Sequence, residues 1–136
     1  MTTIDRFEGE NEFLSNLFPC EIEFEGKVYP SSEHAFQATR TLDEVEREWI
    51  RAAKSGRSAK TVGKSVTVQR DWDFKRTAWM RTVLDIKFSN PELRAKLRAT
   101  GDATLVEGGD KFWGVSGGSG ENRLGKILMQ IRETLS

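Results

Sequence analysis

The sequence feature that most constrains the fold is a helical pattern of large apolar residues between Asp71 and Phe88. Residues spaced three, four or seven apart share one face of an α-helix, so this pattern predicts one long amphipathic helix. Its apolar face consists of Trp72, Trp79, Met80, Val83, Leu84 and Phe88. A second helical pattern begins near Asn122 and carries Leu124, Ile127, Leu128, Ile131 and Leu135. Both faces need partners, so we expect helices to build most of the core.

The first thirty residues are predicted to form short strands. Apolar and charged residues alternate in "EIEFEGKVYP", which indicates a hairpin that turns at 25–27. A helix is expected after Pro30, with Ser31 or Ser32 as its cap. A second helix is expected to begin with a capping box at 43–46 and to end at Gly56. The apolar faces predicted for these two helices are Ala35, Ala38 and Leu42, and Val45, Trp49 and Ala52.

The rest of the chain adds two short extended segments and one more helix. "SVTVQ" (65–69) is typical of a short strand or an extended piece, and "ATLVE" (103–107) of a short strand. Asp71 or Asp73 is expected to cap the long helix. Asn90 and Pro91 form a cap followed by proline at the first helical position, and Gly101 closes that helix. We therefore predict a mainly helical α+β fold with a small N-terminal β element, in one compact domain over residues 1–136.

Composition excludes several classes of site. Lys and Arg number 21, as do Asp and Glu, so the net charge is zero and disfavours a protein that binds long nucleic acid tightly. Cys20 and His34 are the only cysteine and histidine, which rules out internal disulfides and the usual zinc ligand set. No apolar run reaches membrane-spanning length, and the acidic, polar N-terminus is unlike a signal peptide. We expect a cytoplasmic protein with no membrane partner, metal or cofactor.

Glycine is concentrated near the C-terminus, where seven of the twelve glycines lie between Gly108 and Gly125. Glycine permits positive φ and close approach of the backbone, and this stretch leads into the last predicted helix. It is therefore either a slack connector or a loop that admits a phosphate to a helix N-terminus. Candidates for phosphate contact are Gly117, Gly118, Gly120 and Asn122. Neither the P-loop nor the dinucleotide-binding fingerprint is present.

Lys87 lies on the apolar face of the long predicted helix, because it follows Met80 by seven, Val83 by four and Leu84 by three residues. A desolvated lysine has a lowered pKa and can act as a nucleophilic amine toward a carbonyl carbon. The alternative is that its stem covers neighbouring apolar side chains while the ammonium reaches water.

Other polar candidates lie near predicted element ends. Glu33 and His34 begin a helix in "PSSEH", where a structural role for each is the ordinary alternative. Asp110 and Trp113 precede the glycine-rich stretch, and either Trp113 or Trp72 could stack on a ring or fill the core. The remaining candidates, Ser15 and Asn16, interrupt the aromatic segment "FLSNLFP" as turn formers or ligand contacts.

Six stretches in order, "FLSNLFP", "SSEHAFQA", "DWDFKRTAWM", "DIKFSNPELRAKL", "TGDATLVEGGDKFWG" and "GENRLGKILMQIR", resemble the NADAR family, also called YbiA-like. The resemblance runs from about Phe7 to Arg132. It implies a compact, mainly helical α+β domain that hydrolyses an N-glycosidic bond to the anomeric carbon of a ribose. Arg40 and Ser116 depart from residues common in the family, at positions that could alter the choice of substrate.

The resemblance also implies roles for the candidate residues. A lysine that forms a Schiff base with the opened ribose is placed by motif position on Lys87 of "IKF", with Lys75 as the alternative. Glu33 is expected to act as general acid and base, and Asp110 to contact the ribose or stabilise positive charge at its anomeric carbon. The expected substrate contacts are Ser15, Asn16, His34, Trp72, Trp113, Gly117, Gly118, Gly120 and Asn122.

Three functional hypotheses follow. The first is removal of ADP-ribose from guanine in nucleic acid, on a single-stranded or flipped-out base, in partnership with an ADP-ribosyltransferase. The second keeps the reaction but acts on early, ribose-phosphate-bearing intermediates of riboflavin synthesis. The third is a module that binds ADP-ribose or NAD without catalysis.

Overall fold

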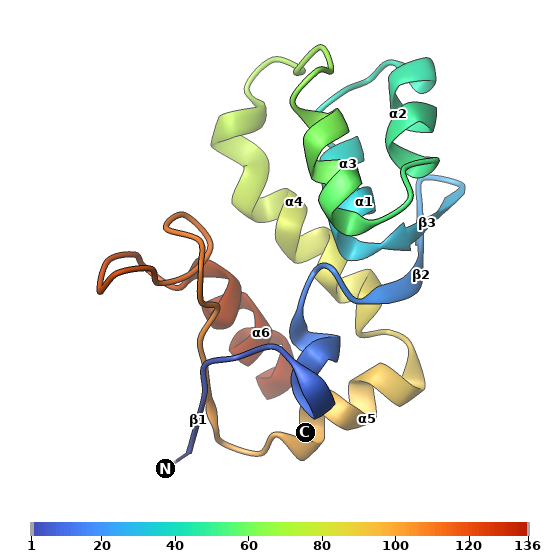
Figure 1. Cartoon of the computed structure of the whole chain (residues 1–136). Helices are drawn as coiled ribbons and strands as arrows, with labels where there is room; N and C mark the ends of the chain where they lie inside the picture. The colour runs from blue at the N-terminus through green and yellow to red at the C-terminus, as the bar shows by residue number, and fades with distance from the viewer. Residues whose placement is uncertain (1, 136) are drawn as a thin grey trace. The chain divides into compact units, whose positions relative to one another are not determined.

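The computed structural model describes residues 2–135, which form two compact units (Figure 1). The central unit comprises Asn16–Lys87, and the terminal unit combines the N-terminal segment up to Ser15 with the chain from Phe88 onward. Within the described residues, helices predominate and the strands form two small two-stranded sheets. The predicted mainly helical α+β fold is therefore confirmed.

The central unit begins with the predicted hairpin. Strands β2 (Pro19–Phe24) and β3 (Lys27–Ser31) pair antiparallel, with Ile22 opposite Tyr29. The turn places Glu25 and Gly26 at φ 49° and 85°, a left-handed conformation that glycine adopts without steric cost. Helix α1 (Ser32–Ala38) follows β3 directly. Its N-cap is Ser31, whose hydroxyl accepts a hydrogen bond from the backbone N–H of His34 at 3.1 Å, as one of the two predicted caps.

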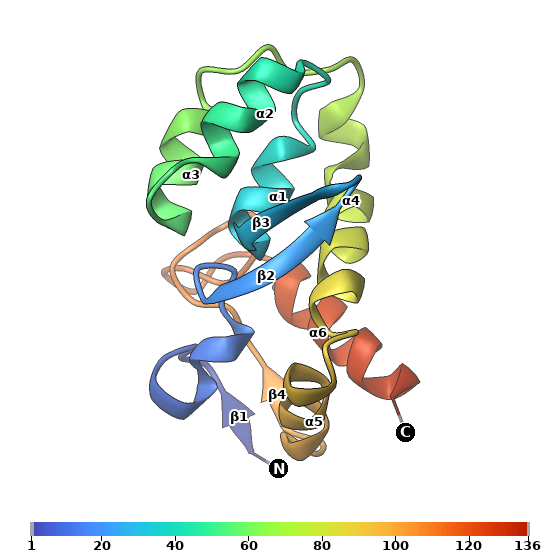
Figure 2. The same cartoon turned by 90° about the vertical axis from the view of Figure 1, so that its right-hand side faces the viewer.

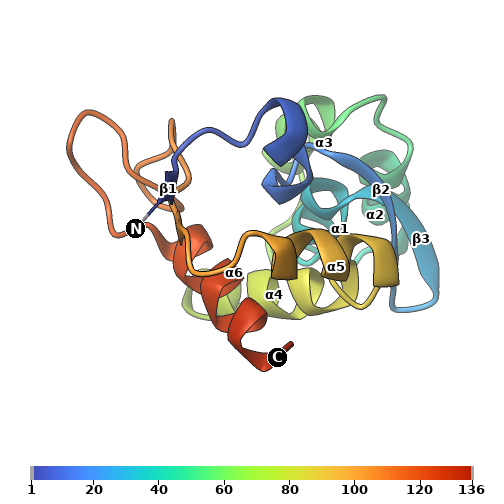
Figure 3. The same ribbon diagram turned by 90° about the horizontal axis from the view of Figure 1, so that it is seen from below.

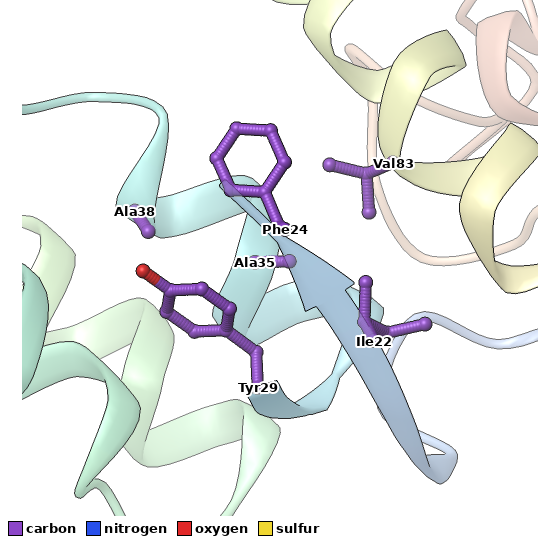
Figure 4. Packing of buried hydrophobic residues seen from close by; sticks show 6 residues of the cluster. All are labelled: Ile22, Phe24, Tyr29, Ala35, Ala38 and Val83. Atoms are coloured by element: carbon purple, nitrogen blue, oxygen red, sulfur yellow. The ribbon is translucent and has the colours of Figure 1, made fainter. Parts of the chain in front are cut away.

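The hairpin lies against α1 and the long helix α4 (Trp72–Lys87), as Figure 2 shows. Figure 4 shows the core at this junction, where Ile22, Phe24 and Tyr29 of the hairpin face small side chains of α1 and Val83 of α4. The small side chains are Ala35 and Ala38, both fully buried. Alanine at these positions lets the aromatic rings of the hairpin approach the helix backbone.

Helix α2 (Glu44–Arg51) corrects the predicted apolar face. Val45 and Trp49 are 61% and 53% exposed, and Leu42, assigned to the face of the preceding helix, is 70% exposed. The buried face instead carries Ile50 with two charged side chains, Glu46 and Arg47.

Hydrogen bonds explain why charged side chains can occupy the buried face of α2. Glu46 accepts hydrogen bonds from the hydroxyl of Thr41 and the backbone N–H of Thr67. Arg47 donates to the backbone oxygen of Thr41 and to the carboxylate of Glu25. Buried charged groups that are fully paired avoid most of the cost of leaving water. Because Glu46 turns toward Thr67, only the Asp43 half of the predicted capping box forms.

Two further predictions in the central unit are wrong. Gly56 does not end α2, because it is the first residue of helix α3 (Gly56–Gly63), which the sequence pattern did not reveal. Residues 65–69 form no strand, so of the two alternatives predicted for them the short strand is wrong. Their backbone bonds elsewhere: the N–H of Gln69 donates to the oxygen of Arg40, and that of Thr67 to Glu46. β-propensity alone makes no strand where no partner strand is in reach.

The terminal unit joins both ends of the chain. Strand β1 (Thr3–Ile4) pairs parallel with β4 (Thr104–Leu105), which lies within the predicted "ATLVE" strand (Figure 3). The segment between β1 and the central unit is a 3-10 helix, η1 (Gly9–Leu14), where a strand was predicted. Helices α5 (Pro91–Ala99) and α6 (Arg123–Thr134) lie where the sequence predicts them, and Asn90 caps α5 through the backbone N–H groups of Glu92 and Leu93.

The core of the terminal unit comes from these same elements. Phe13 of η1 meets the ring of Phe88 edge-on at 6.5 Å between centroids. The other buried hydrophobic side chains of the unit are Leu14, Leu93, Leu97, Ala103, Leu105, Leu124, Ile127, Leu128 and Ile131. Across residues 2–135, no helix combines the length and the apolar character needed to cross a membrane.

Candidate active site

Lys87 is the last residue of α4, and its side chain is 1% exposed. Its ammonium nitrogen lies 5.8 Å from the centre of the Phe18 ring. Burial lowers the pKa of this ammonium to about 8, and the charge of a Cys20 thiolate would oppose that change. The alternative in which the ammonium reaches water is therefore wrong. A larger fraction of this amine is neutral near pH 7 than of an ordinary lysine.

Cys20 is a neighbour that sequence reasoning did not connect with Lys87. Burial raises the pKa of its thiol, while the charge of Lys87 and a hydrogen bond with the backbone of Ser32 lower it. Strand β2 packs against α4, and Cys20 near the start of β2 contacts the core cluster that contains Val83 of α4. No pattern in the sequence signals this proximity, because the two residues lie in different elements.

Glu33 lies in the first turn of α1, and its side chain is buried. Its carboxylate accepts a hydrogen bond from the side-chain amide of Gln37, at 2.8 Å between Nε2 and Oε2. Its backbone N–H donates to the backbone oxygen of Asn16 at 3.0 Å. The positive end of the helix dipole favours a carboxylate at this position.

Asn16 ties its loop to α1. The side-chain oxygen of Asn16 accepts a hydrogen bond from the hydroxyl of Ser32 at 2.8 Å, and its amide nitrogen lies 3.5 Å from the sulfur of Met80 in α4. Its side chain is 8% exposed. The segment from Asn16 to Cys20 thus contacts the first turn of α1, where Glu33 lies, and the end of α4, where Lys87 lies.

His34 has partners within the protein for both ring nitrogens. Its Nδ1 lies 2.6 Å from the hydroxyl oxygen of Ser31, and its Nε2 lies 2.9 Å from the backbone oxygen of Ala53. A backbone oxygen only accepts, so Nε2 carries the proton and Nδ1 accepts from the Ser31 hydroxyl. The structure therefore supports the structural alternative for His34 over direct contact with a substrate.

Trp72 is a core residue, which corrects its predicted role as a stacking platform. It is 3% exposed, and its indole N–H donates to the hydroxyl of Thr39 at 3.0 Å. Its ring packs against Phe36, and the guanidinium of Arg40 covers it at 4.5 Å from the ring centre. Lys75, the alternative reactive lysine, is exposed on α4 and lacks the burial that lowers the pKa of Lys87.

The glycine-rich stretch belongs to the terminal unit and forms the looped segment before α6 in Figure 1. It is not a slack connector. A Cβ atom on Gly114 would overlap the backbone oxygen of Glu107, and one on Gly120 would overlap the backbone oxygen of Gly114. The N–H of Val115 donates to that same Glu107 oxygen at 2.8 Å. These glycines let the loop pack against its own backbone.

Gly117 and Gly118 differ from Gly120. They occupy the tip of the loop at φ 59° and 77°, between Ser116 and Ser119, whose backbones exchange two hydrogen bonds. A Cβ atom on either would meet nothing within 4 Å. The tip is therefore the part of the stretch that a ligand can approach, whereas Gly120 serves the packing of the loop.

Asp110 and Asn122 hold the base of this loop. One carboxylate oxygen of Asp110 accepts from the backbone N–H groups of Phe112 and Trp113, both at 2.8 Å. The side chain of Asn122 accepts from the N–H of Glu107 and donates to the oxygen of Leu105, and it does not cap α6. Both ends of its amide thus bind backbone groups and hold the loop, and its predicted contact with phosphate stays a prediction.

The remaining predicted residues of the terminal unit are Trp113 and Ser15. Trp113 is half-buried and meets the ring of Phe112 edge-on at 4.8 Å, while the guanidinium of Arg123 covers Phe112. The N–H of Ser15 donates to Glu12 and closes η1. Among residues 2–135, no group of three or more His, Cys, Asp or Glu side chains is placed to hold a metal ion.

Comparison with known families and proteins identifies relatives. The NADAR domain model matches residues 5–136. N-glycosidase YbiA of Escherichia coli is 43% identical over 129 residues, which cover 90% of this chain and 81% of that protein. A riboflavin biosynthesis protein of Vibrio vulnificus is 40% identical over 129 residues, covering 90% of this chain but 35% of that longer protein.

The fold also matches a solved structure. The NMR structure of E. coli YbiA superimposes with a TM-score of 0.87 at 40% sequence identity. The match covers 98% of this chain and 84% of that one. The arrangement of helices and small sheets described above is therefore shared with that protein.

Proposed function

The chain belongs to the NADAR domain family, and from this premise we propose that it is an N-glycosidase that hydrolyses the bond between a ribose anomeric carbon and a base nitrogen. The observation that carries the proposal is Lys87, a buried amine whose pKa is lowered to about 8. Burial that lowers the pKa of a lysine enlarges the fraction of neutral amine that is available for nucleophilic attack. The names of the relatives in E. coli and Nostoc punctiforme support the same class of reaction.

The proposed reaction uses Lys87 as the nucleophile. Its neutral amine bonds to C1′ of the ribose, the bond from C1′ to the base nitrogen breaks, and Glu33 donates the proton that the leaving base takes up. The ring oxygen then leaves C1′ with a proton, which gives a Schiff base between Lys87 and the opened ribose. Water adds to C1′, the bond from C1′ to the lysine nitrogen breaks, and Glu33 takes up the proton that is released, which restores both the amine and the acid.

Carboxylates stabilise the positive charge that develops at the anomeric carbon. On the resemblance of their motifs, Asp110 is proposed to supply such a carboxylate, and Asn16 and Trp113 to contact the nucleoside part. The open tip at Gly117 and Gly118 receives a phosphate. The geometry that supports the last assignment is the free space around both glycines.

The first proposed substrate is ADP-ribose attached to guanine in nucleic acid, which the enzyme would remove to reverse the work of an ADP-ribosyltransferase. The resemblance of the six sequence stretches supports it. The second candidate is a ribose-phosphate-bearing intermediate of riboflavin synthesis. It is favoured by the names of two relatives, in V. vulnificus and Zea mays, that are riboflavin biosynthesis proteins.

The test is to incubate the protein with ADP-ribosylated single-stranded DNA and, separately, with the early riboflavin intermediates, and to measure release of the base. Borohydride should trap a covalent adduct on wild-type protein. We expect Lys87→Ala to abolish both turnover and trapping, and Lys87→Arg to retain the charge without the chemistry.

Lys75→Ala is the matched control, because Lys75 is an exposed lysine on the same helix. It should leave turnover and trapping unchanged. Near-normal rates in Lys87→Ala would contradict the assignment of the nucleophile. Tight binding of ADP-ribose without turnover of either substrate would instead support the non-catalytic module.

A further inference from the structure

We propose that Gln37 is a positioning residue that fixes the carboxylate of Glu33, and that Gly63 of α3 in turn fixes Gln37. The importance of this for catalysis rests on the function proposed above for Glu33. The proposal itself rests on the packing of α1 against α3 within the central unit.

The side chains of Gln37 and Glu33 are in direct contact. Gln37 lies one helical turn after Glu33, and its amide Nε2 donates to the carboxylate Oε2 at 2.8 Å. Both side chains are buried, at 6% and 9% exposure. A buried carboxylate needs hydrogen-bond donors in place of water. The amide of Gln37 supplies one such donor.

Gly63 of α3 lies directly against the side-chain amide of Gln37. A Cβ atom on Gly63 would overlap the side-chain oxygen of Gln37 and would lie 3.3 Å from its Cγ. The φ of Gly63 is not positive, so the helix backbone does not require glycine there. What requires it is the amide of Gln37, which fills the space where a side chain would begin. The amide therefore has no room to turn toward α3.

Helix α3 also borders Glu33. A Cβ atom on Gly56, at the other end of α3, would lie 2.8 Å from a methyl carbon of Leu17 and 3.5 Å from Cβ of Glu33. The two glycines that begin and end α3 thus allow it to approach the side of α1 that carries Glu33 and Gln37. Small displacements of a group that transfers protons reduce the rate strongly, so this packing has a catalytic consequence.

The experiment compares Gln37→Met and Gly63→Ala with wild type. Met keeps the length of the side chain but removes the donor, and Ala at 63 leaves Gln37 chemically intact but displaces its amide. Thr61→Ala, an exposed position on the same helix, is the control. On whichever substrate turns over, we expect kcat to fall about tenfold or more in both variants with KM within about twofold, and no change in the control.

Coupling to Glu33 separates positioning from a general structural role. In a Glu33→Gln background, Gln37→Met should cause no further fall in kcat. Where Glu33→Gln itself lowers kcat, losses that simply multiply, or an unchanged kcat in Gln37→Met, would overturn the proposal. Thermal unfolding of each variant checks that it is folded.

A crystallographic readout needs no turnover. In crystal structures of Gln37→Met and Gly63→Ala, we expect the Glu33 carboxylate to leave its wild-type position. If it stays in place in both variants, the proposal is wrong, whatever the rates. If the carboxylate moves but Glu33→Gln keeps the full wild-type rate, the positioning holds and the catalytic role proposed for Glu33 fails.

Discussion

At the residue scale, Lys87 combines a buried ammonium with a position at the end of α4, next to Phe18. With a pKa of about 8, roughly a tenth of this amine is neutral at pH 7, whereas an ordinary lysine is almost entirely charged. The rate of attack on C1′ depends on the neutral form. Burial thus gives the proposed reaction a supply of nucleophile at ordinary pH.

The pH dependence of the rate follows from this value. While Glu33 keeps its proton, we expect the single-turnover rate of base release to rise with pH below about 8, by close to tenfold per pH unit, and loss of that proton should lower the rate at higher pH. Rapid-quench measurements between pH 6 and 9 would show the profile. A rate that does not change over this range would mean that ionisation of Lys87 does not govern the chemical step.

Burial of the Lys87 ammonium also lowers the free energy of unfolding, by an amount that depends on pH. The pKa of Lys87 is lower in the folded protein, about 8, than its ordinary value of 10.5, so between these values the unfolded chain binds more protons. The free energy of unfolding therefore rises as pH increases from about 8 to 10.5. At pH 7 the cost of the buried charge is roughly 3 kcal/mol, by the conversion of about 1.4 kcal/mol per pKa unit.

Lys87→Met should remove the free-energy cost of burying the charged ammonium. We expect a higher free energy of unfolding at pH 7, by up to roughly 3 kcal/mol, because Met fills similar space without a charge. Urea unfolding at pH 7 and again at pH 9.5 would measure the gain, which should shrink at the higher pH. A variant less stable than wild type at pH 7 would mean that burial of this charge does not lower the stability of the protein.

At the scale of elements, the loop before α6 uses its glycines in two ways. Gly120 packs against the backbone of Gly114, whereas Gly118 is at the open tip with φ 77°. We expect Gly120→Ala to lower the melting temperature, because its Cβ has no space. Gly118→Asn should leave it nearly unchanged, since Asn tolerates left-handed φ. The Asn side chain should nevertheless raise KM several-fold, by occupying the space proposed for a phosphate.

The two variants together decide the role of the tip. Differential scanning fluorimetry and steady-state kinetics on the same preparations would give both quantities. Equal loss of stability and affinity in Gly118→Asn would show that the tip, like Gly120, serves only the fold.

Two substitutions in helix α2 test which of its faces is buried. Trp49 is 53% exposed while its neighbour Ile50 is fully buried. We expect Trp49→Gln to change the free energy of unfolding by less than about 0.5 kcal/mol, and Ile50→Ala to lower it by about 2–4 kcal/mol. Chemical denaturation would measure both. A larger loss from Trp49→Gln would mean that the indole has a buried partner in solution.

At the scale of the whole molecule, the equal numbers of acidic and basic residues affect how strongly the binding of nucleic acid depends on salt. Affinity for long nucleic acid falls with salt in proportion to the phosphates that a protein neutralises. We expect KM for an ADP-ribosylated single-stranded oligonucleotide to change less than about threefold between 50 and 200 mM salt. ADP-ribosylated guanosine is the control substrate. A hundredfold salt effect with the oligonucleotide alone would reveal an extended phosphate-binding surface.

Local signals in the sequence determined several parts of this protein. The hairpin turn at 25–27 and the helix caps at Ser31 or Ser32 and at Asn90 depend on residues a few positions apart, so local geometry was sufficient to predict them. The same spacing placed Lys87 on the apolar face of its helix but left open whether its ammonium is buried, which the structure decided. The order of six motifs indicated the family, which the domain match confirms.

Only the tertiary structure decided which face of α2 is buried, that Trp72 belongs to the core, and that Asn122 binds the backbone beside β4. It also revealed α3, whose two end glycines border Glu33 and Gln37. In each case the partner lies in a different element: Thr67 for Glu46, Thr39 for Trp72, and Leu105 for Asn122. Periodicity within one segment carries no information about a hydrogen-bond partner elsewhere in the chain. A polar side chain with such a partner can therefore take the buried position that a hydrophobic pattern assigns to an apolar one.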